Sequence, residues 1–342
     1  MSNFPLDKND LDKVLSLTNT HGGFSEIFLE HTAQHAILAE DNKVEKITSG
    51  RDIGAGIRLI KFPFTYYAAT NDLSLKNMER LATELATAGM LENKNVVIDK
   101  VIAKDNLAPG PETTYKTLPD SIPLTQKIEK VLAANTAARN CDERIKQVTV
   151  GYRDTTQDIL VVNSAGLSAT DLRVRTRLTV QATAKEKEML QSGYEGPAGL
   201  CGFDFFNTHL PEEIALEAAE RALLMLEAIP APGGSMAVVL AGEAGGTLIH
   251  EACGHGFEAD FIQKKTSIFH DKFGQLVLSP LLTVIDDGTL PGHFGSGRID
   301  DEGTTCRKNI LIEKGRVAGF LQDRFTATML NMKLTGNGRR ES

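Results

Sequence analysis

The chain has 342 residues, 41% of them hydrophobic and 24% charged, and its formal net charge at pH 7 is −8. This length exceeds what one compact core usually organises, so we expect two domains. The acidic balance, the dispersed Lys and Arg residues and an aromatic fraction of 6% argue against nucleic-acid binding. The first residues show no signal peptide or membrane span, and four scattered cysteines show no disulfide framework. We therefore expect a cytoplasmic protein.

The N-terminal part of the chain mixes two helices with several strands. Apolar residues recur at helical spacing over residues 7–21, and Gly22 and Gly23 end that helix. A second helix is expected from a cap at Asn71 or Asp72 to Gly89. Between the helices, alternating apolar residues predict an antiparallel meander of five short strands at residues 24–31, 34–39, 44–48, 53–60 and 64–69.

The middle of the chain repeats this mixture. Apolar stripes predict helices over residues 125–140 and 212–229. Residues 147–152 and 158–163 read as paired strands, and residues 172–184 alternate long enough for one extended, half-exposed strand. The expected fold class is therefore α+β, with an N-terminal domain of helices layered on a mostly antiparallel sheet.

Two proline- and glycine-rich stretches predict loops. One covers residues 106–114. The other, Pro230-Ala231-Pro232-Gly233-Gly234, breaks both helix and strand and is the best linker in the sequence. We expect it to separate an N-terminal domain, residues 1–230, from a C-terminal domain, residues 235–342.

The C-terminal domain is expected to be rich in β-structure. An apolar strand at residues 236–240 should lead into a helix, and further strands are expected at residues 309–312 and 318–322. We expect these strands to form a sheet or partial barrel around the helix.

That helix carries the segment His250-Glu251-Ala252-Cys253-Gly254-His255. Catalytic zinc takes about three protein ligands and acidifies a bound water, and a nearby carboxylate removes the proton. The sequence therefore nominates His250 and His255 as ligands of Zn²⁺ and Glu251 as the catalytic base. Cys253 is better suited to packing under the helix, because a buried free cysteine usually behaves as a small hydrophobic residue.

The spacing of the two histidines has a structural consequence. The familiar pattern His-Glu-x-x-His puts both rings on one face of a regular helix, whereas this segment has one more residue. Five residues rotate a side chain by roughly 140° from its starting direction. A π-bulge, with bonds from residue i to i+5, would bring the rings together again. We expect this distortion at residues 250–255, eased by Gly254.

Acidic residues outside the segment allow two interpretations. Glu258 and Asp260 could orient the histidines, or they could lie on a solvated helix end. The stretches Asp286-Asp287-Gly288 and Asp300-Asp301-Glu302-Gly303 could bind calcium, but their spacing does not match a calcium-binding loop. We expect them to form turns, the second near the substrate.

The segment from residue 250 to 260, His-Glu-Ala-Cys-Gly-His-Gly-Phe-Glu-Ala-Asp, resembles the metal motif of the TldD/PmbA family of metallopeptidases. Three other segments resemble family signatures in the same order: residues 43–58, 300–304 and 335–342. The resemblance runs from about residue 7 to the last residue. It implies a TldD-type subunit, the member of the pair that keeps the metal motif.

This resemblance implies proteolysis of small or unfolded polypeptides, bound as an extended strand. It also implies a homodimer or a heterodimer with a PmbA-like subunit. Family members carry a third zinc ligand, a cysteine after the Gly-Asn-Gly-Arg-Arg signature, and this chain ends at Ser342 before that region. We therefore expect a C-terminal truncation relative to the family. The alternative function is a non-catalytic subunit that binds peptides or assists assembly.

Overall fold

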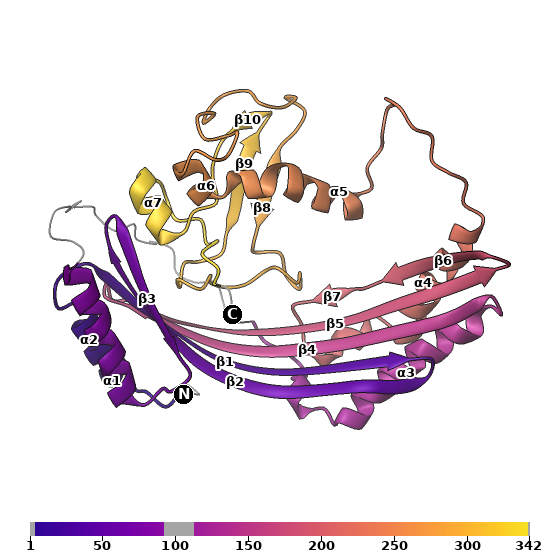
Figure 1. Cartoon of the computed structure of the whole chain (residues 1–342), viewed down its shortest axis with the longest axis horizontal. Helices are drawn as coiled ribbons and strands as arrows, with labels where there is room; N and C mark the ends of the chain where they lie inside the picture. The colour runs from indigo at the N-terminus through magenta and orange to yellow at the C-terminus, as the bar shows by residue number, and fades with distance from the viewer. Residues whose placement is uncertain (1–3, 92–112, 341–342) are drawn as a thin grey trace.

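The computed structural model describes residues 4–91 and 113–340. Most of the loop expected at residues 106–114 lies outside these ranges. Within them, two antiparallel sheets and several helices confirm the α+β class (Figure 1). No helix in these ranges combines the length and the apolar character that crossing a membrane requires.

The larger sheet is long and strongly curved (Figure 1). Its strands follow the order β3-β2-β1-β4-β5-β6, and β7 pairs with β5. Every pairing is antiparallel. The strands are β1 (Phe24–Glu40), β2 (Lys43–Lys61), β3 (Phe64–Thr70), β4 (Ile145–Asn163), β5 (Ser168–Glu186), β6 (Met189–Glu195) and β7 (Ala198–Gly199).

The expected meander of short strands was wrong in one respect, since the strands do not break where the sequence turns polar. Residues 24–31 and 34–39 form one strand, β1, and residues 44–48 and 53–60 form another, β2. The two segments expected as a strand pair at 147–152 and 158–163 likewise lie within β4. The polar residues of β1 and β4 are tolerated because these strands hydrogen-bond there on both sides, whereas residues 49–52 of β2 pair with β1 alone. The β1–β2 turn was predicted correctly, and Asp41 and Asn42 have positive φ there.

Helices cover one face of this sheet and leave the other open. At one end α1 (Lys8–Thr18) and α2 (Leu75–Leu91) pack on Ile27 and Leu29 of β1. At the other end α3 (Leu124–Cys141) and α4 (Pro211–Leu226) pack on Ile37 of the same strand. Since side chains two residues apart share a face, all four helices lie on one side, as Figure 1 shows. Two short helices, η1 (Pro119–Ser121) and η2 (Phe203–Asn207), complete this part.

A buried polar cluster fixes α3 to the sheet. The Lys127 ammonium from α3 lies 2.6 Å from the Asp154 carboxylate of β4, and both side chains are almost fully buried. Tyr152 donates a hydrogen bond of 2.6 Å to the same carboxylate, and His35 Nδ1 lies 2.9 Å from its other oxygen. The buried Asp154 carboxylate therefore has three polar partners within the protein.

The C-terminal part lies over the open face of the long sheet (Figure 1). It has a separate hydrophobic cluster around Phe257, Ile312 and Phe320. A second, three-stranded sheet has the order β10-β9-β8. The elements are α5 (Gly242–Ile249), η3 (His250–Gly254), η4 (His255–Phe257), α6 (Ala259–Gln263), β8 (Val284–Asp287), β9 (Lys308–Glu313), β10 (Arg316–Val317) and α7 (Arg324–Leu330).

The described strands of the C-terminal part form an open sheet of three, so of the two expected forms the sheet is the one present. Two other expectations for this part need correction. Residues 318–322 form no strand: Ala318 and Gly319 both bond to the Leu311 carbonyl, and Leu321 makes an isolated bridge with Glu258. Residues 236–240 also form no strand, since they are exposed and have no neighbouring strand. The domain boundary at residues 230–235 stays a prediction.

We predict that Gly193→Ala destabilises the fold by about 1–3 kcal/mol, because an added Cβ would overpack the contact between β6 and α4. That Cβ would lie 2.1 Å from the Ala218 carbonyl oxygen and 2.5 Å from the Ala222 nitrogen. Gly50→Ala on β2 is the matched control, since a Cβ at Gly50 meets no atom within 4 Å. Urea denaturation of both variants measures the difference, and equal stabilities would contradict this packing.

Candidate metal centre

The predicted distortion of the helix is present. After α5 the chain passes into a π-helix at His250–Gly254 and then into a 3₁₀-turn at His255–Phe257. The His255 N–H donates to the His250 carbonyl, which is an i to i+5 bond. The extra residue in the motif is thus absorbed by one wide turn, and the expectation of a π-bulge is confirmed.

The wide turn brings the three nominated side chains together. The imidazole rings of His250 and His255 have centroids 4.5 Å apart and are inclined at 65°. Each of His250, Glu251 and His255 offers a ligand atom, and these atoms lie within 4.8 Å of one another. All three residues are exposed. Two imidazoles and a carboxylate at this separation suit Zn²⁺. Their assignment as two ligands and a base stays a prediction.

Gly254 has a different role from the one expected. Its φ of −51° and ψ of −59° are ordinary helical values that any residue adopts. A Cβ at this position would lie 2.9 Å from His250 Nδ1 and 3.4 Å from His250 Cγ. The glycine is therefore needed for the space that the His250 ring occupies, rather than for backbone freedom.

Cys253 lies on the other side of the wide turn, in the hydrophobic cluster of the C-terminal part. It is 5% exposed, and burial raises the pKa of its thiol. Phe257, which is fully buried, follows it on the same side. Cys253 thus packs beneath the turn, as expected, and the metal-binding geometry rests on a small apolar core.

Of the two carboxylates that follow the motif, one contacts a histidine. Glu258 Oε1 lies 2.7 Å from His255 Nδ1, which leaves the Nε2 atom of that ring available to a metal. Asp260 instead pairs with Lys264 at 2.9 Å on an exposed surface. The orienting interpretation therefore fits Glu258, and the solvated interpretation fits Asp260.

A cavity of about 550 Å³ lies next to Glu258. Glu258 and Asp260 line one side, and the sheet residue Arg58 lines another. The remaining lining includes Glu302 and the Asn337–Arg340 stretch of the C-terminal signature. The cavity therefore connects the metal motif with a buried group of charged residues.

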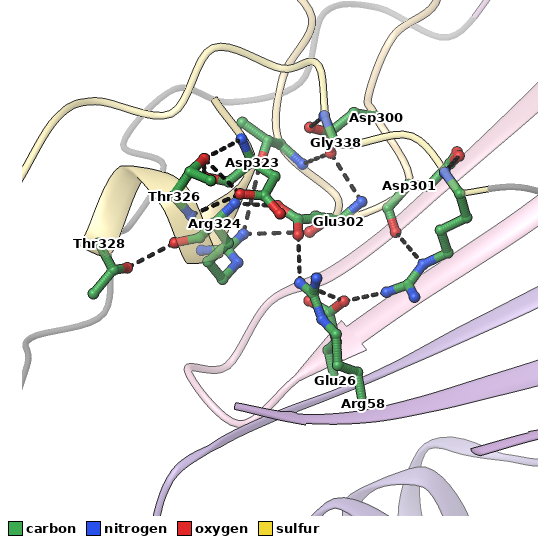
Figure 2. Close-up of polar contacts among 12 residues, drawn as sticks. Glu26, Arg58, Asp300, Asp301, Glu302, Asp323, Arg324, Thr326, Thr328 and Gly338 are labelled. Atoms are coloured by element: carbon green, nitrogen blue, oxygen red, sulfur yellow. Dashed lines mark hydrogen bonds and ion pairs between the residues drawn. The ribbon is translucent and has the colours of Figure 1, made fainter. Parts of the chain in front are cut away.

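This charged group, shown in Figure 2, joins the C-terminal part to the sheet. Glu302, 3% exposed, contacts the Arg58 guanidinium of β2 and accepts a hydrogen bond of 2.7 Å from the Arg324 backbone N–H. Arg58 also lies 2.9 Å from Glu26 of β1. Burial alone would raise the pKa of Glu302, but the positive charges of Arg58 and Arg324 lower it below its usual value.

A second link lies beside the first. Arg173 of β5 is 1% exposed and lies 2.7 Å from Asp301 and 3.2 Å from Asp171. Arg340 contacts Glu26 and donates its backbone N–H to Asp301 at 2.8 Å. The segment at 300–304 and the described part of the C-terminal signature, residues 335–340, thus bind each other and the sheet.

The turn at 300–304 is a structural turn, in agreement with the expectation. Asp300 Oδ1 accepts hydrogen bonds from the backbone N–H groups of Glu302 and Thr304, at 2.9 and 2.8 Å. Its other oxygen accepts one from Gly338 N at 2.8 Å. A Cβ at Gly338 would lie 2.8 Å from Glu302 Cγ, so the glycine lets the signature loop approach the buried carboxylate.

Sequence reasoning missed the sheet residues of this group, namely Glu26, Arg58 and Arg173. A signal was present, because each is a charged residue beside apolar ones in a segment expected to be a strand. The partners could not be paired from the sequence, since Arg58 and Glu302 are separated by 244 positions.

We predict that Gly254→Ala weakens zinc binding by about tenfold, the lower end of the loss that follows from disturbing the support of a metal ligand. The added methyl displaces the His250 ring from its position. Gly246→Ala in α5 is the control, since a Cβ there meets nothing within 4 Å and should leave zinc affinity unchanged. Competition with a chromogenic chelator gives both affinities, and equal values would refute the role of Gly254.

We also predict that Glu302→Gln lowers the free energy of unfolding by about 3–5 kcal/mol, because it removes the charge of one of the two carboxylates that compensate the buried Arg58. Glu313→Gln on β9 serves as the control, since Glu313 is exposed. It should change stability by less than about 0.5 kcal/mol. Urea unfolding of the two variants tests this, and a stable Glu302→Gln protein would show that the contact is dispensable.

Comparison with known proteins agrees with this arrangement. Models of the PmbA/TldA metallopeptidase family match the chain in three parts: domain 1 at residues 25–88, the central domain at 117–226 and the C-terminal domain at 233–342. A metalloprotease TldD homolog of Haemophilus influenzae is 31% identical over 326 residues, which cover 93% of this chain and 67% of that protein.

Two further relatives extend the comparison. A metalloprotease of Methanocaldococcus jannaschii is 32% identical and covers 97% of this chain and 73% of its own length. The crystal structure of TldE from Thermococcus kodakarensis has a TM-score of 0.78 at 19% identity, covering 97% of this chain and 74% of that one, which shows a shared fold. On the strength of the three domain matches and the identities above 30%, the chain belongs to the PmbA/TldD family of metallopeptidases.

Proposed function

We propose that this chain is the metal-binding subunit of a zinc-dependent peptidase, with His250 and His255 as ligands and Glu251 as the catalytic base. The observation that carries this proposal is the π-helical turn, which gathers all three side chains within 4.8 Å. A regular helix would turn the two rings apart by roughly 140°. The family and the names of its relatives support a metalloprotease role.

The donor set fits zinc better than a harder cation. Imidazole nitrogen is a preferred ligand of Zn²⁺, whereas Ca²⁺ and Mg²⁺ prefer clusters of oxygen atoms. Zinc held here would supply a Lewis acid that polarises a peptide carbonyl and acidifies water. His250 and His255 supply two of the about three protein ligands that catalytic zinc takes. The proposed third ligand is the cysteine that the resemblance to the family implies. It is not Cys253, which lies in the apolar core.

The other side chains have defined tasks. Glu251 accepts a proton from water on its carboxylate and returns it to the nitrogen of the departing amine. Glu258 accepts the Nδ1 proton of His255, which fixes the ring orientation and directs Nε2 outward. Glu251 directly follows one proposed ligand in the sequence, and Glu258 contacts the other.

The substrate class proposed is a small or unfolded polypeptide. Such a chain can bind as an extended strand, and β3 and β6 at the edges of the long sheet each have one unpaired side among the described strands. A dimer partner, either a second copy or a PmbA-like subunit, is part of the proposal. Exposed apolar residues on and before α5, with Val239 97% and Leu248 49% exposed, favour such a partner. Cytoplasmic location stays a prediction.

We predict that Glu251→Gln lowers the hydrolysis of an unfolded protein such as casein by about 10²–10⁴-fold, the usual contribution of a general base. The substitution keeps the shape of the side chain and removes its ability to take a proton. Zinc content, measured by elemental analysis, should stay equal to that of the parent. Full activity in the variant would eliminate the proposed mechanism.

The ligand assignment has a separate test in the same measurement. His250→Ala and His255→Ala should each lose bound zinc, while His293→Ala, which removes another exposed histidine, should retain it. If zinc is absent from the parent chain as well as the variants, the non-catalytic peptide-binding role becomes the better account.

A further inference from the structure

Three arginines gather on the open face of the long sheet, in the stretch that begins two residues after Arg173 on β5. The strand register places Arg153 of β4 directly opposite Arg177 of β5. Arg175 lies two residues before Arg177 and therefore on the same face. Their neighbours Tyr152 and Leu178 point the other way, into the core beneath α3 and α4.

None of the three has a carboxylate within ion-pair distance in the part of the chain that the structure describes. Arg153 donates to Gln34 Oε1 at 3.0 Å, and Arg177 donates to the Tyr194 hydroxyl at 2.9 Å. Arg175 donates to the Phe294 carbonyl at 3.0 Å. All these acceptors are neutral. By contrast, Arg58 and Arg173 on the same face each contact two carboxylates.

This arrangement places like charges together without compensation. Positive side chains directly opposite each other on paired strands repel. Burial, followed by the positive charges of Arg173 and Arg339, lowers the pKa of Arg175 to about 10. The whole chain has a formal net charge of −8, whereas these three side chains form a positive group. An anionic occupant would relieve the repulsion.

A cavity of about 340 Å³ adjoins two of these arginines. Its lining includes Ala36 and Leu38 of β1, and Leu38 is 40% exposed. Lys46, paired with Leu38 across β1 and β2, adds another positive charge to the lining beside Arg153 and Arg177. The surface thus combines an apolar floor with cationic side chains.

We propose that this surface, formed by Lys46, Arg153, Arg175 and Arg177, binds an acidic stretch of the polypeptide substrate. The inference rests on the proposed function for the substrate class. Carboxylates of the peptide would pair with the guanidinium groups, and an aliphatic side chain would lie on Leu38. The surface lies on the face of the sheet that also carries the C-terminal part with His250 and His255 (Figure 1). It would hold a peptide at a distance from the cleaved bond and so select acidic substrates.

A peptide suits the surface better than nucleic acid. A phosphate backbone carries a charge on every nucleotide and needs a long basic track, whereas this surface offers a few cations on a protein of net charge −8. The apolar floor at Ala36 and Leu38 has no aromatic ring among its lining on which a base could stack, apart from the largely buried Tyr152.

The test measures binding in the Glu251→Gln background, so that no cleavage occurs. Fluorescence anisotropy compares a fluorescein-labelled peptide of Glu-Leu-Gly repeats with its Gln-Leu-Gly counterpart. We expect the acidic peptide to bind about tenfold more tightly, and to lose this advantage as NaCl screens the charges. In Arg153→Gln/Arg177→Gln the two peptides should bind equally. Arg153→Lys/Arg177→Lys, which keeps the charges, should retain most of the preference.

The control variant, Lys76→Gln/Arg80→Gln, removes the same charge from α2 in the helix layer on the other face and should bind as the parent does. Circular dichroism of each variant reports folding. Equal affinity for both peptides, or an undiminished preference in Arg153→Gln/Arg177→Gln, would overturn the inference. Tighter binding of a single-stranded oligonucleotide, lost in the same variant, would also overturn it. Zinc content and hydrolysis are not read in this assay, so failure of the proposed peptidase activity is distinguishable from failure of this inference.

Discussion

The arrangement of the two parts of this molecule depends on one buried carboxylate, Glu302. It lies between the guanidinium of Arg58 on the long sheet and the start of α7 at Arg324. Removing charges from water is costly, so a buried ion pair adds little stability compared with apolar packing. It does disfavour other arrangements of the two parts, because moving one partner of the ion pair away leaves the other charge buried and uncompensated. We infer that it sets how the C-terminal part sits on the sheet, and with it the cavity beside Glu258.

Much of the fold and the centre of the site could be predicted from the sequence. Helical periodicity located α1, α3 and α4 to within a few residues. The interval between His250 and His255 predicted the π-turn, because only one local distortion reunites the rings. These predictions succeeded because they concern residues close together in the chain, where geometry limits the choices.

The failures have a common physical cause, since each depended on a neighbour distant in sequence. The polar residues within β1 and β2 looked like breaks, but both strands continue through them because β1 and β2 pair with each other along their whole length. Residues 236–240 looked like a strand, but they have no strand to pair with. The contact of His35 with the buried Asp154 joins residues 119 positions apart. A local sequence pattern, however clear, does not show which distant part of the chain the segment will contact.

The way α5 is attached has a consequence for regulation. The helix reaches the metal motif with Leu248 and Ile249 exposed, and the turn beyond it enters an apolar core at Cys253 and Phe257. A molecule that covers Leu248 and Ile249 would therefore act on the same rigid element that carries His250. Thermodynamic linkage then requires that the occupancy of the metal and the occupancy of that surface influence each other equally. Assembly with a partner and binding of the metal would then be thermodynamically coupled.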